Sequence, residues 1–535
     1  MKEQSTAKGF AILSAGTVAV KIISLLYIPF LRAILGDEGY GIFGAAYQVY
    51  AFIFVITNSG IPVAISKLVS ELNAVGNYRD ALKSFKISRF MLMLLGIFMS
   101  IALIALANPM SKALHYEKAY LSMLTLAPAV LFTSMASAYR GYFQGRKNMI
   151  PTAASQVLEQ VANTVFALIF AAYLMRFGVE AGCAGAPIGT SMGALISAVF
   201  LMYYCEKNKK FNDQRAEQNP EVVRLKTKQL VKKIIHYSIP ITICVGMTYA
   251  GNLVDLYNTK VRLMAGGFSD TNATILYGYL VKYQQLLNVP IALISSLSAA
   301  ILPALSAAAA VRNRKELHNK ITYSLRLCFL IALPCAVGLG VLSTPIYNML
   351  KFGNGAFIMA YGSVVLIFMS VMQIQSTILQ GIGKLYIATL FSITGIVCKI
   401  IVNYFLIAIP QINILGAVIG SVVGFTIPIL LNQRIINKTL KISIRLYKHG
   451  IKPLAASILM GILVFATYFL FSRVLSILGK NYLFLSISVT ASIVAGAYYY
   501  LIGLILTKGI KKQDLNMIPN KLKKFIPDYF IRKIV

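Results

Sequence analysis

The feature that most constrains this 535-residue chain is a succession of apolar stretches, each about 20 residues long and nearly free of charge. A stretch of that length crosses the hydrocarbon core of a bilayer as a helix. Only 13% of the residues are charged, whereas soluble proteins carry about a quarter. The sequence therefore predicts an all-α polytopic membrane protein and excludes a soluble globular fold.

About fourteen stretches qualify as transmembrane helices. We expect the first of them to be an uncleaved span, because it is longer than the core of a signal peptide and contains no small-residue cleavage site. The expected spans are residues 10–31, 41–65, 90–107, 120–139, 152–175, 183–204, 236–257, 272–300, 322–343, 356–380, 385–407, 414–433, 453–472 and 482–506.

The distribution of basic residues supports this assignment. Of the 51 Lys and Arg residues, 39 fall on the side of the chain's N-terminus, nine fall on the opposite side, and three, Lys21, Lys282 and Lys399, fall inside spans. Because basic loops stay in the cytoplasm, we expect both termini to be cytoplasmic and the protein to lie in the cell membrane. The net charge of +34 then reflects topology and attraction to anionic membrane lipids, and it does not indicate a nucleic-acid partner.

Short motifs recur between the two halves at offsets of 231 to 241 residues. Because each copy would contain six spans, the repeat predicts two six-helix lobes related by a pseudo-two-fold axis along the membrane normal. Two C-terminal helices lie outside the repeat. The paired motifs are Ile61-Pro62 with Leu302-Pro303, Gln144-Gly145 with Gln380-Gly381, and the segment Gly185 to Thr190 with the segment Gly416 to Ser421.

The same pattern predicts the domain boundaries. We expect an N-terminal lobe at residues 1–205, a cytoplasmic linker at 206–235 and a C-terminal lobe at 236–435. The two additional helices occupy 450–506, and a basic cytoplasmic tail follows at 507–535.

Lysines inside spans require an explanation, because a charge at the bilayer centre costs about 2.5–3.5 kcal/mol on insertion scales. Lys21 and Lys282 both fall near the predicted midplane, too deep for the side chain to reach the interface comfortably. They either face a shared ligand cavity as cations or form ion pairs that serve packing.

Other polar residues within or next to the spans have two possible roles each. Glu159 is a polar helix contact, including a partner for Lys21, or an ion-coupling carboxylate. Lys399 and Asn403 lie one turn apart, and we expect Lys399 to pair with Asp255; the alternative is a cation site built from the carboxylate and amides. Arg32 belongs either to a solvated turn or to a substrate contact.

The motifs of soluble enzymes are absent from the sequence. It has no phosphate-binding Gly-rich loop, no nucleophile elbow and no CxxC pair among its six cysteines, and its four histidines lack ligand spacing. We therefore expect no enzymatic activity, no metal site and no cofactor. Transport would draw on coupling to Na⁺ or H⁺, on the membrane potential or on the substrate gradient.

Two blocks of sequence resemble a known family. The segments Arg32 to Gly41 and Gly60 to Lys67 are similar to the opening of the polysaccharide-biosynthesis flippases of the multidrug/oligosaccharidyl-lipid/polysaccharide (MOP) exporter superfamily. The segment Tyr139 to Thr152, continuing to Gln160, resembles the stage V sporulation protein B-like branch and its lipid II flippase relatives in Gram-positive bacteria.

This resemblance implies a V-shaped transporter with two lobes and alternating access. Its central cationic cavity would take the diphosphate and sugars of an undecaprenyl-linked glycan, such as lipid II or a related cell-wall, spore-cortex or polysaccharide intermediate. The two last helices would form a groove for the polyprenyl tail. The residues that we expect to bind substrate are Lys21, Lys282, Arg32 and Gln48.

One departure from the family pattern concerns the second helix. Gram-negative lipid II flippases carry a cavity arginine there, whereas this chain has Tyr47, Gln48 and Tyr50. Lysine binds phosphate as a point charge and arginine binds it bidentately, so the headgroup could be held differently.

Two other functions are compatible with the sequence. One is a drug or organic-cation antiporter on a MATE-like fold, which would favour an acidic cavity. The other is a membrane scaffold for cell-envelope synthesis enzymes, which would bind through the linker at 206–235 and the basic tail.

Overall fold

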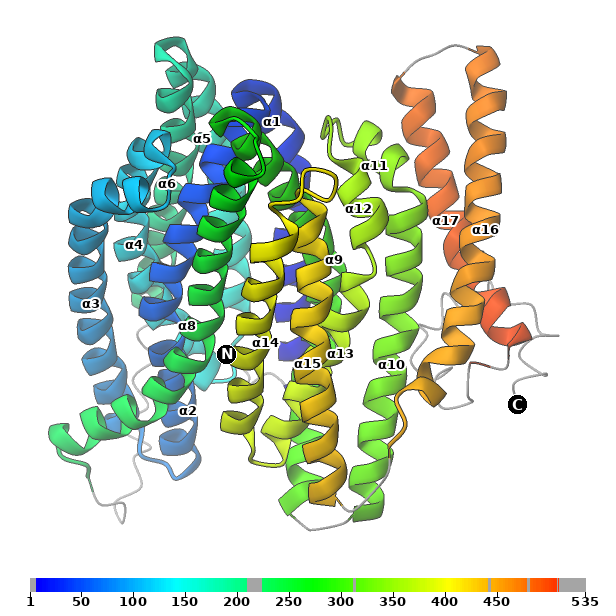
Figure 1. The fold of residues 1–535 in the computed structure, drawn as a ribbon. Coiled ribbons are helices and arrows are strands. Elements are labelled where there is room, and N and C mark those ends of the chain that lie inside the picture. Colours follow the sequence, from blue (N-terminus) through cyan, green and yellow to red (C-terminus); the bar gives the residue numbers. More distant parts are fainter. Residues whose placement is uncertain are drawn as a thin grey trace. The chain divides into compact units, whose positions relative to one another are not determined.

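The computed structural model describes residues 6–208, 224–310, 314–440, 444–478, 482–507 and 509. Every regular element in these ranges is a helix, which confirms the all-α prediction (Figure 1). Half of the predicted linker at 206–235 and nearly all of the predicted tail at 507–535 lie outside the described residues.

The chain divides into two compact units. Unit 1 comprises Met1–Val281 with Asn403–Ile414, and unit 2 comprises Lys282–Val402 with Leu415–Val535. Unit 1 therefore contains the predicted N-terminal lobe and the start of the predicted C-terminal lobe. Unit 2 contains most of the rest of the C-terminal lobe and the two additional helices. The predicted lobe boundaries stay a prediction. The elements of unit 1 are α1 (Thr6–Asn58), α2 (Gly60–Ala74), α3 (Tyr78–Ala113), η1 (Glu117–Ala119), α4 (Tyr120–Gly145), α5 (Ile150–Leu174), η2 (Met175–Phe177), α6 (Val179–Lys207), α8 (Thr227–Ala265) and the first part of α9 (Asp270–Ala310).

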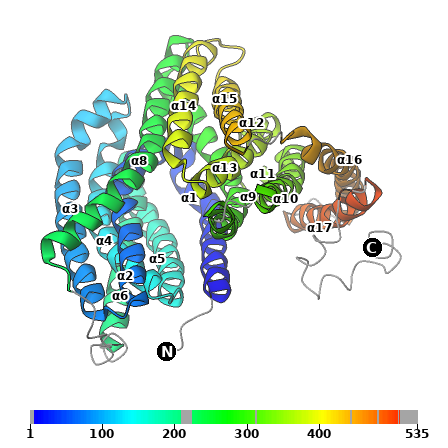
Figure 2. The same ribbon diagram turned by 90° about the horizontal axis from the view of Figure 1, so that it is seen from below.

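Unit 2 begins inside α9 and contains the last two long helices. Within it α16 and α17 pack on each other and on α10 (Figure 2). Its elements after α9 are α10 (Arg314–Val341), α11 (Ser343–Met349), α12 (Ala356–Gly362), α13 (Val365–Gly381), α14 (Leu385–Leu406, whose last residues belong to unit 1), α15 (Leu415–Leu440), α16 (Tyr447–Leu478) and α17 (Tyr482–Leu506).

Eleven helices of the described residues are long and apolar enough to cross a membrane, or twelve if the bent pair α12 and α13 forms one span. The predicted total of fourteen is therefore not confirmed. Part of the difference is α1, which at 53 residues would extend about 80 Å and cannot be a single crossing. It is broken at Gly36, between the two stretches that the sequence predicts as separate spans.

Local sequence signals set the starts of three helices, α3, α5 and α6. Asn77 caps α3, because its side-chain oxygen accepts the backbone N–H of Asp80 at 3.2 Å. Pro151 lies in the first turn of α5, where its missing N–H costs nothing. Gly178, with φ of 112°, forms the turn that precedes α6.

Small residues allow two helix pairs to approach closely. A Cβ on Gly189 of α6 would lie 2.3 Å from the Ala167 nitrogen of α5. In unit 2, a Cβ on Gly395 of α14 would lie 2.2 Å from the Gly424 oxygen of α15. Contacts of this kind are typical of helix packing in membranes, where association depends on backbones that lie close together.

The core of unit 1 is built where α2, α3, α4 and α6 lie side by side (Figure 2). Phe85 of α3 stacks on Tyr142 of α4, with ring centroids 4.3 Å apart. Leu230 and Ile234 of α8 are fully buried against the same cluster. These contacts fix the start of α8 to α2 and to the first half of α3.

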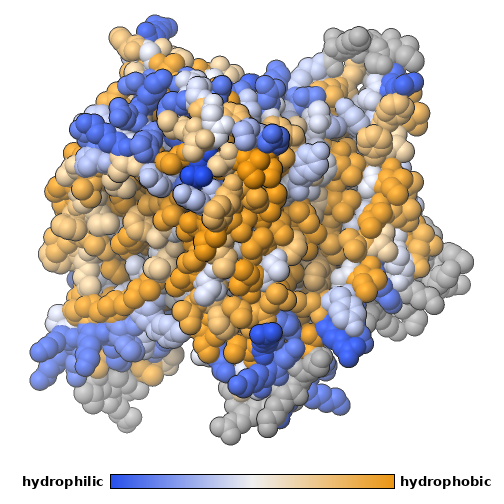
Figure 3. Space-filling model, in the orientation of Figure 1, coloured by the Kyte–Doolittle hydropathy of each residue, from blue (hydrophilic) through white to orange (hydrophobic). Residues whose placement is uncertain are grey.

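The outer surface of unit 1 is apolar over the middle of its helices. Along α3, Phe90 is 56% exposed, Phe98 67% and Ile101 60%. Figure 3 shows an apolar belt over the part where α3 and α8 lie, with hydrophilic residues beyond both ends. Exposed apolar side chains arranged in this way fit a surface that faces lipid, so the chain is a multi-pass membrane protein.

The packing of α5 on α6 yields a first prediction. We expect Gly189→Ala to lower the apparent melting temperature in detergent, because the added methyl group meets backbone that cannot give way, at a cost of about 1–3 kcal/mol. Gly246→Ala in α8 is the matched control, since nothing lies within 4 Å of its Cβ, and there the better helix propensity of alanine should leave stability equal or higher. Equal stability of the two variants would contradict the assigned contact.

Candidate functional site

An ion pair lies between the helices of unit 1. The Arg140 guanidinium of α4 donates to the Glu159 carboxylate of α5 at 2.5 Å. It also donates to the hydroxyls of Ser155 at 3.0 Å and Ser197 at 2.8 Å. The two charged side chains are 14% and 25% exposed. Three helices are thus joined by one arginine, and its charge is largely balanced.

Tyrosines of the second part of α1 extend this polar region. The rings of Tyr47 and Tyr50 lie 5.5 Å apart, and both tyrosines interact electrostatically with Glu159. Tyr50 is buried and hydrogen-bonds Thr133, whereas Tyr47 is 36% exposed. Tyr47 and Tyr50, which lie in the segment where the resembled flippases carry an arginine, therefore supply hydroxyl groups near the Arg140–Glu159 pair.

Lys21 lies in the first part of α1 and is partly buried. Near it, α1 contacts α5, since a Cβ on Gly16 would lie 3.0 Å from the Ala153 Cβ. Lys21 has no hydrogen bond or ion pair with any residue of the described ranges. Glu159, one of the partners that the sequence suggested, is instead paired with Arg140.

Lys282 has a different environment in unit 2. Its side chain is fully buried, and its ammonium donates to the carbonyls of Phe352 at 2.7 Å and Asn354 at 3.2 Å. These carbonyls belong to the tight turn between α11 and α12, where Lys351, Gly353 and Gly355 all have positive φ. In this conformation Lys282 holds a turn and is not exposed in an open cavity, so its predicted contact with substrate stays a prediction.

Asp255 of α8 accepts a hydrogen bond from the Asn403 amide, and both side chains belong to unit 1. Asp255 is 7% exposed and Asn403 is fully buried. A carboxylate with amide oxygens suits a hard cation such as Na⁺. The predicted pair of Asp255 with Lys399 joins residues of the two units and stays a prediction. Among the residues that the structure describes, no group of three His, Cys, Asp or Glu side chains could hold a metal ion.

Charged residues also gather near the break in α1. Arg32 donates to both carboxylate oxygens of Asp37, at 2.8 and 3.1 Å, and so spans Gly36. Glu38 accepts from Lys118 at 2.7 Å. This favours a structural role for Arg32, and its predicted contact with substrate is not tested. Gln48 hydrogen-bonds Tyr277.

Sequence reasoning missed the roles of Arg140 and Lys260. Both were assigned to loops because each follows the end of an apolar run, yet α4 continues to Gly145 and α8 to Ala265. Lys260 is 2% exposed, pairs with Asp270 at 2.8 Å and lies 4.1 Å from the centre of the Tyr116 ring. Glu159 itself carried the signal for Arg140, since a carboxylate inside a span requires a partner from a neighbouring helix.

The Arg140–Glu159 pair yields a second prediction. We expect Glu159→Gln to destabilise the protein by about 1–3 kcal/mol, because the partly buried guanidinium loses its counter-charge. The double variant Arg140→Met with Glu159→Gln should recover much of that loss. Denaturant or thermal unfolding of wild type and the two variants measures this, and a double variant no more stable than Glu159→Gln would contradict the pairing.

The two membrane lysines yield a third prediction. Lys282→Met should lower stability by about 1–3 kcal/mol, because two carbonyls of the turn lose their donor. Lys21→Met is the matched control and should change stability by less than about 0.5 kcal/mol, since it breaks no bond with the described residues. Apparent melting temperatures in one detergent compare them, and equal shifts would contradict the different roles.

Comparison with known proteins places the chain in a family. Residues 6–309 match the profile of the polysaccharide biosynthesis proteins. The chain is 27% identical over 530 residues to stage V sporulation protein B of Bacillus subtilis (strain 168), covering 97% of this chain and 98% of the relative. It is 26% identical over 527 residues to the lipid II flippase MurJ of the same organism, covering 93% and 94%.

A solved structure shares the fold. It is the inward-facing conformation of a multidrug resistance MATE family transporter of the MOP superfamily, with a TM-score of 0.66 at 16% identity, covering 79% of this chain and 95% of that one. The fold is therefore one that membrane transporters use. The chain belongs to the polysaccharide biosynthesis protein family.

Proposed function

We propose that the protein is a flippase that moves an undecaprenyl-diphosphate-linked glycan precursor across the cytoplasmic membrane by alternating access. The substrate would be lipid II or a related cell-wall, spore-cortex or polysaccharide intermediate. The family and the relatives with flippase and sporulation names support this proposal. The observation that carries it is Lys21, a partly buried cation in a membrane span with no partner among the described residues.

Lys21 fits the proposal because a charged ammonium inside a membrane span costs free energy, and a bound anion would reduce that cost. Arg140 is already balanced by Glu159, and Lys282 already donates to two carbonyls. A diphosphate carries at least two negative charges and would compensate an ammonium that the protein leaves unpaired. The exposed hydroxyl-bearing ring of Tyr47 could donate to a phosphate or sugar oxygen.

The orientation and the coupling are parts of the same proposal. The distribution of Lys and Arg puts both termini in the cytoplasm. The apolar helices α16 and α17, which pack on α10, would provide the groove for the polyprenyl tail.

Coupling to Na⁺ or H⁺ or to the membrane potential would supply the energy, with no enzymatic step. Envelope-synthesis enzymes are expected partners, because such enzymes produce and consume lipid-linked glycans.

A drug or organic-cation antiporter is the alternative, since the MATE structure shares the fold. Such a protein needs a carboxylate that is available to attract a cation. In unit 1 the Glu159 carboxylate is neutralised by Arg140. That pairing favours an anionic substrate over a cationic one.

A transport assay provides the fourth prediction. Proteoliposomes would carry a fluorescent undecaprenyl-diphosphate sugar, and its arrival in the far leaflet would be measured over time. We expect Lys21→Ala to slow transfer by at least about tenfold, equivalent to about 1.4 kcal/mol. Lys438→Ala, which removes an exposed charge of α15, is the control and should transfer lipid at the wild-type rate.

Two outcomes would contradict the proposal at different levels. Transfer in wild-type proteoliposomes that equals transfer in empty liposomes would exclude the flippase function. Wild-type transfer in Lys21→Ala, with the protein folded and correctly inserted, would exclude Lys21 as the residue that binds the diphosphate.

A further inference from the structure

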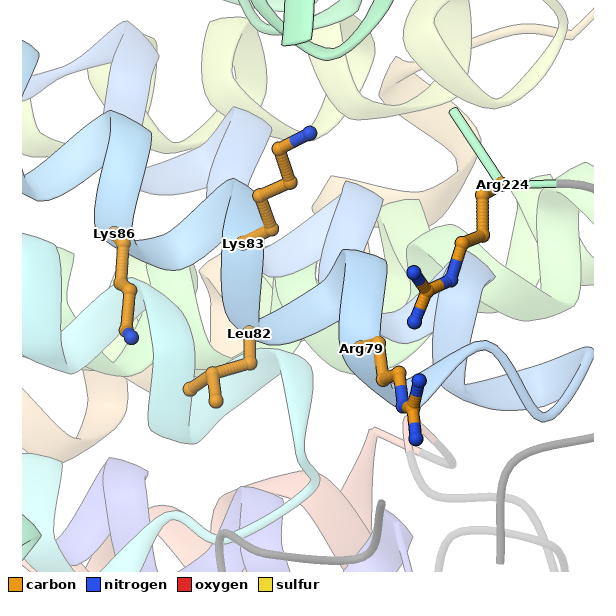
Figure 4. Close-up of a pocket in the computed structure, with 5 residues that line it drawn as sticks. All are labelled: Arg79, Leu82, Lys83, Lys86 and Arg224. Carbon is orange, nitrogen blue, oxygen red and sulfur yellow. The ribbon is translucent and has the colours of Figure 1, made fainter. Parts of the chain in front are cut away.

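Four basic side chains surround a hollow at the start of α3. Arg79, Lys83 and Lys86 come from the first turns of α3, and Arg224 comes from the segment just before α8 (Figure 4). The hollow has a volume of about 420 Å³, and Leu82 is its one apolar lining residue in the described part of the chain. No role of the proposed transport site involves these residues.

Buried contacts hold the two segments together. Asp80 is 3% exposed, and its carboxylate accepts the backbone N–H of Leu225 at 2.7 Å and the Asn77 side-chain amide at 2.9 Å. The bond to Leu225 places the adjacent Arg224 beside α3. Leu230 of α8 is then packed into the core that also contains Phe85 of α3. The basic cluster is therefore a fixed feature of the fold.

The positive charge of this cluster exceeds the nearby negative charge. Lys83, Lys86 and Arg224 make no hydrogen bond or ion pair with any residue in the described ranges. Asp80 is the acidic residue of this helix start, and it is turned inward to its two donors. Like charges around one hollow repel each other, so an anion in the hollow would relieve that repulsion, and the N-terminal end of α3 adds to the attraction.

The depth of the cluster identifies the kind of anion. The exposed apolar face of α3 begins at Phe90, which is 56% exposed, and continues through Leu94 and Phe98. Lys86 lies four positions before Phe90, or about 6 Å along the helix axis. The headgroup layer begins at the edge of the apolar core and extends for several ångströms. The hollow is thus at the level of lipid phosphates.

We propose that Arg79, Lys83, Lys86 and Arg224 form a binding site for the phosphate of an anionic membrane lipid. In the proposed orientation this lipid belongs to the cytoplasmic leaflet. Its headgroup phosphate occupies the hollow while its acyl chains lie along the apolar face of α3. The site does not depend on which molecule the protein transports.

The test measures lipid binding by the full-length protein in detergent. The probes are dihexanoyl phosphatidylglycerol, dihexanoyl phosphatidylcholine, glycerol phosphate and inorganic phosphate. The variant Lys83→Gln, Lys86→Gln, Arg224→Gln removes three charges of the site. The matched control Arg434→Gln, Lys438→Gln, Lys448→Gln removes the same residue types from exposed positions of unit 2.

The wild-type protein should bind phosphatidylglycerol more tightly than the other three probes. The site variant should lose at least about tenfold in affinity, and the control variant should stay within about twofold. The melting temperature of each variant shows that it is folded. Equal losses in both triple variants, or no loss in the site variant, would overturn the site. Binding of glycerol phosphate or inorganic phosphate as tight as that of phosphatidylglycerol would overturn the lipid as its occupant.

Discussion

The high cost of an uncompensated charge inside a bilayer governs the arrangement of polar residues in this protein. Arg140 is balanced by Glu159, Lys260 by Asp270, and the Lys282 ammonium by two carbonyls of a turn. Each pairing also joins two different elements of the chain, so compensation and packing are achieved together. Within the described ranges Lys21 differs, because it is partly buried in a span and has no such partner there, and we therefore propose that it binds the substrate.

The sequence alone predicted the class of fold, the multi-pass topology and the break between the first two spans. These follow from the length of apolar stretches, which is a local property. It predicted less about the site, because side-chain partners depend on where each helix ends and on how the helices pack against each other. The ends of apolar runs were misleading in α4 and α8, since both helices continue beyond the last apolar residue. Arg140 and Lys260 were therefore assigned to loops.

Glycines of two helix pairs lie close to the neighbouring helix. In the first half, a Cβ on Gly193 would lie 2.6 Å from the Glu159 oxygen and 3.1 Å from the Asn163 Cβ. In the second half, a Cβ on Gly424 would lie 2.8 Å from the Lys399 Cβ. Gly193 thus lies against the backbone of Glu159, whereas Gly424 lies against the base of the Lys399 side chain. This difference could not be read from the repeat motifs alone.

Gly36 has φ of 73° and ψ of −179°, in a region of backbone space that is essentially limited to glycine. Nothing lies within 4 Å of its Cβ position, so crowding is not what excludes a side chain there. The Arg32–Asp37 clamp closes over the same corner. Any base change in this codon that replaces the glycine would therefore strain the break in α1, although no neighbouring atom would touch the new side chain's Cβ.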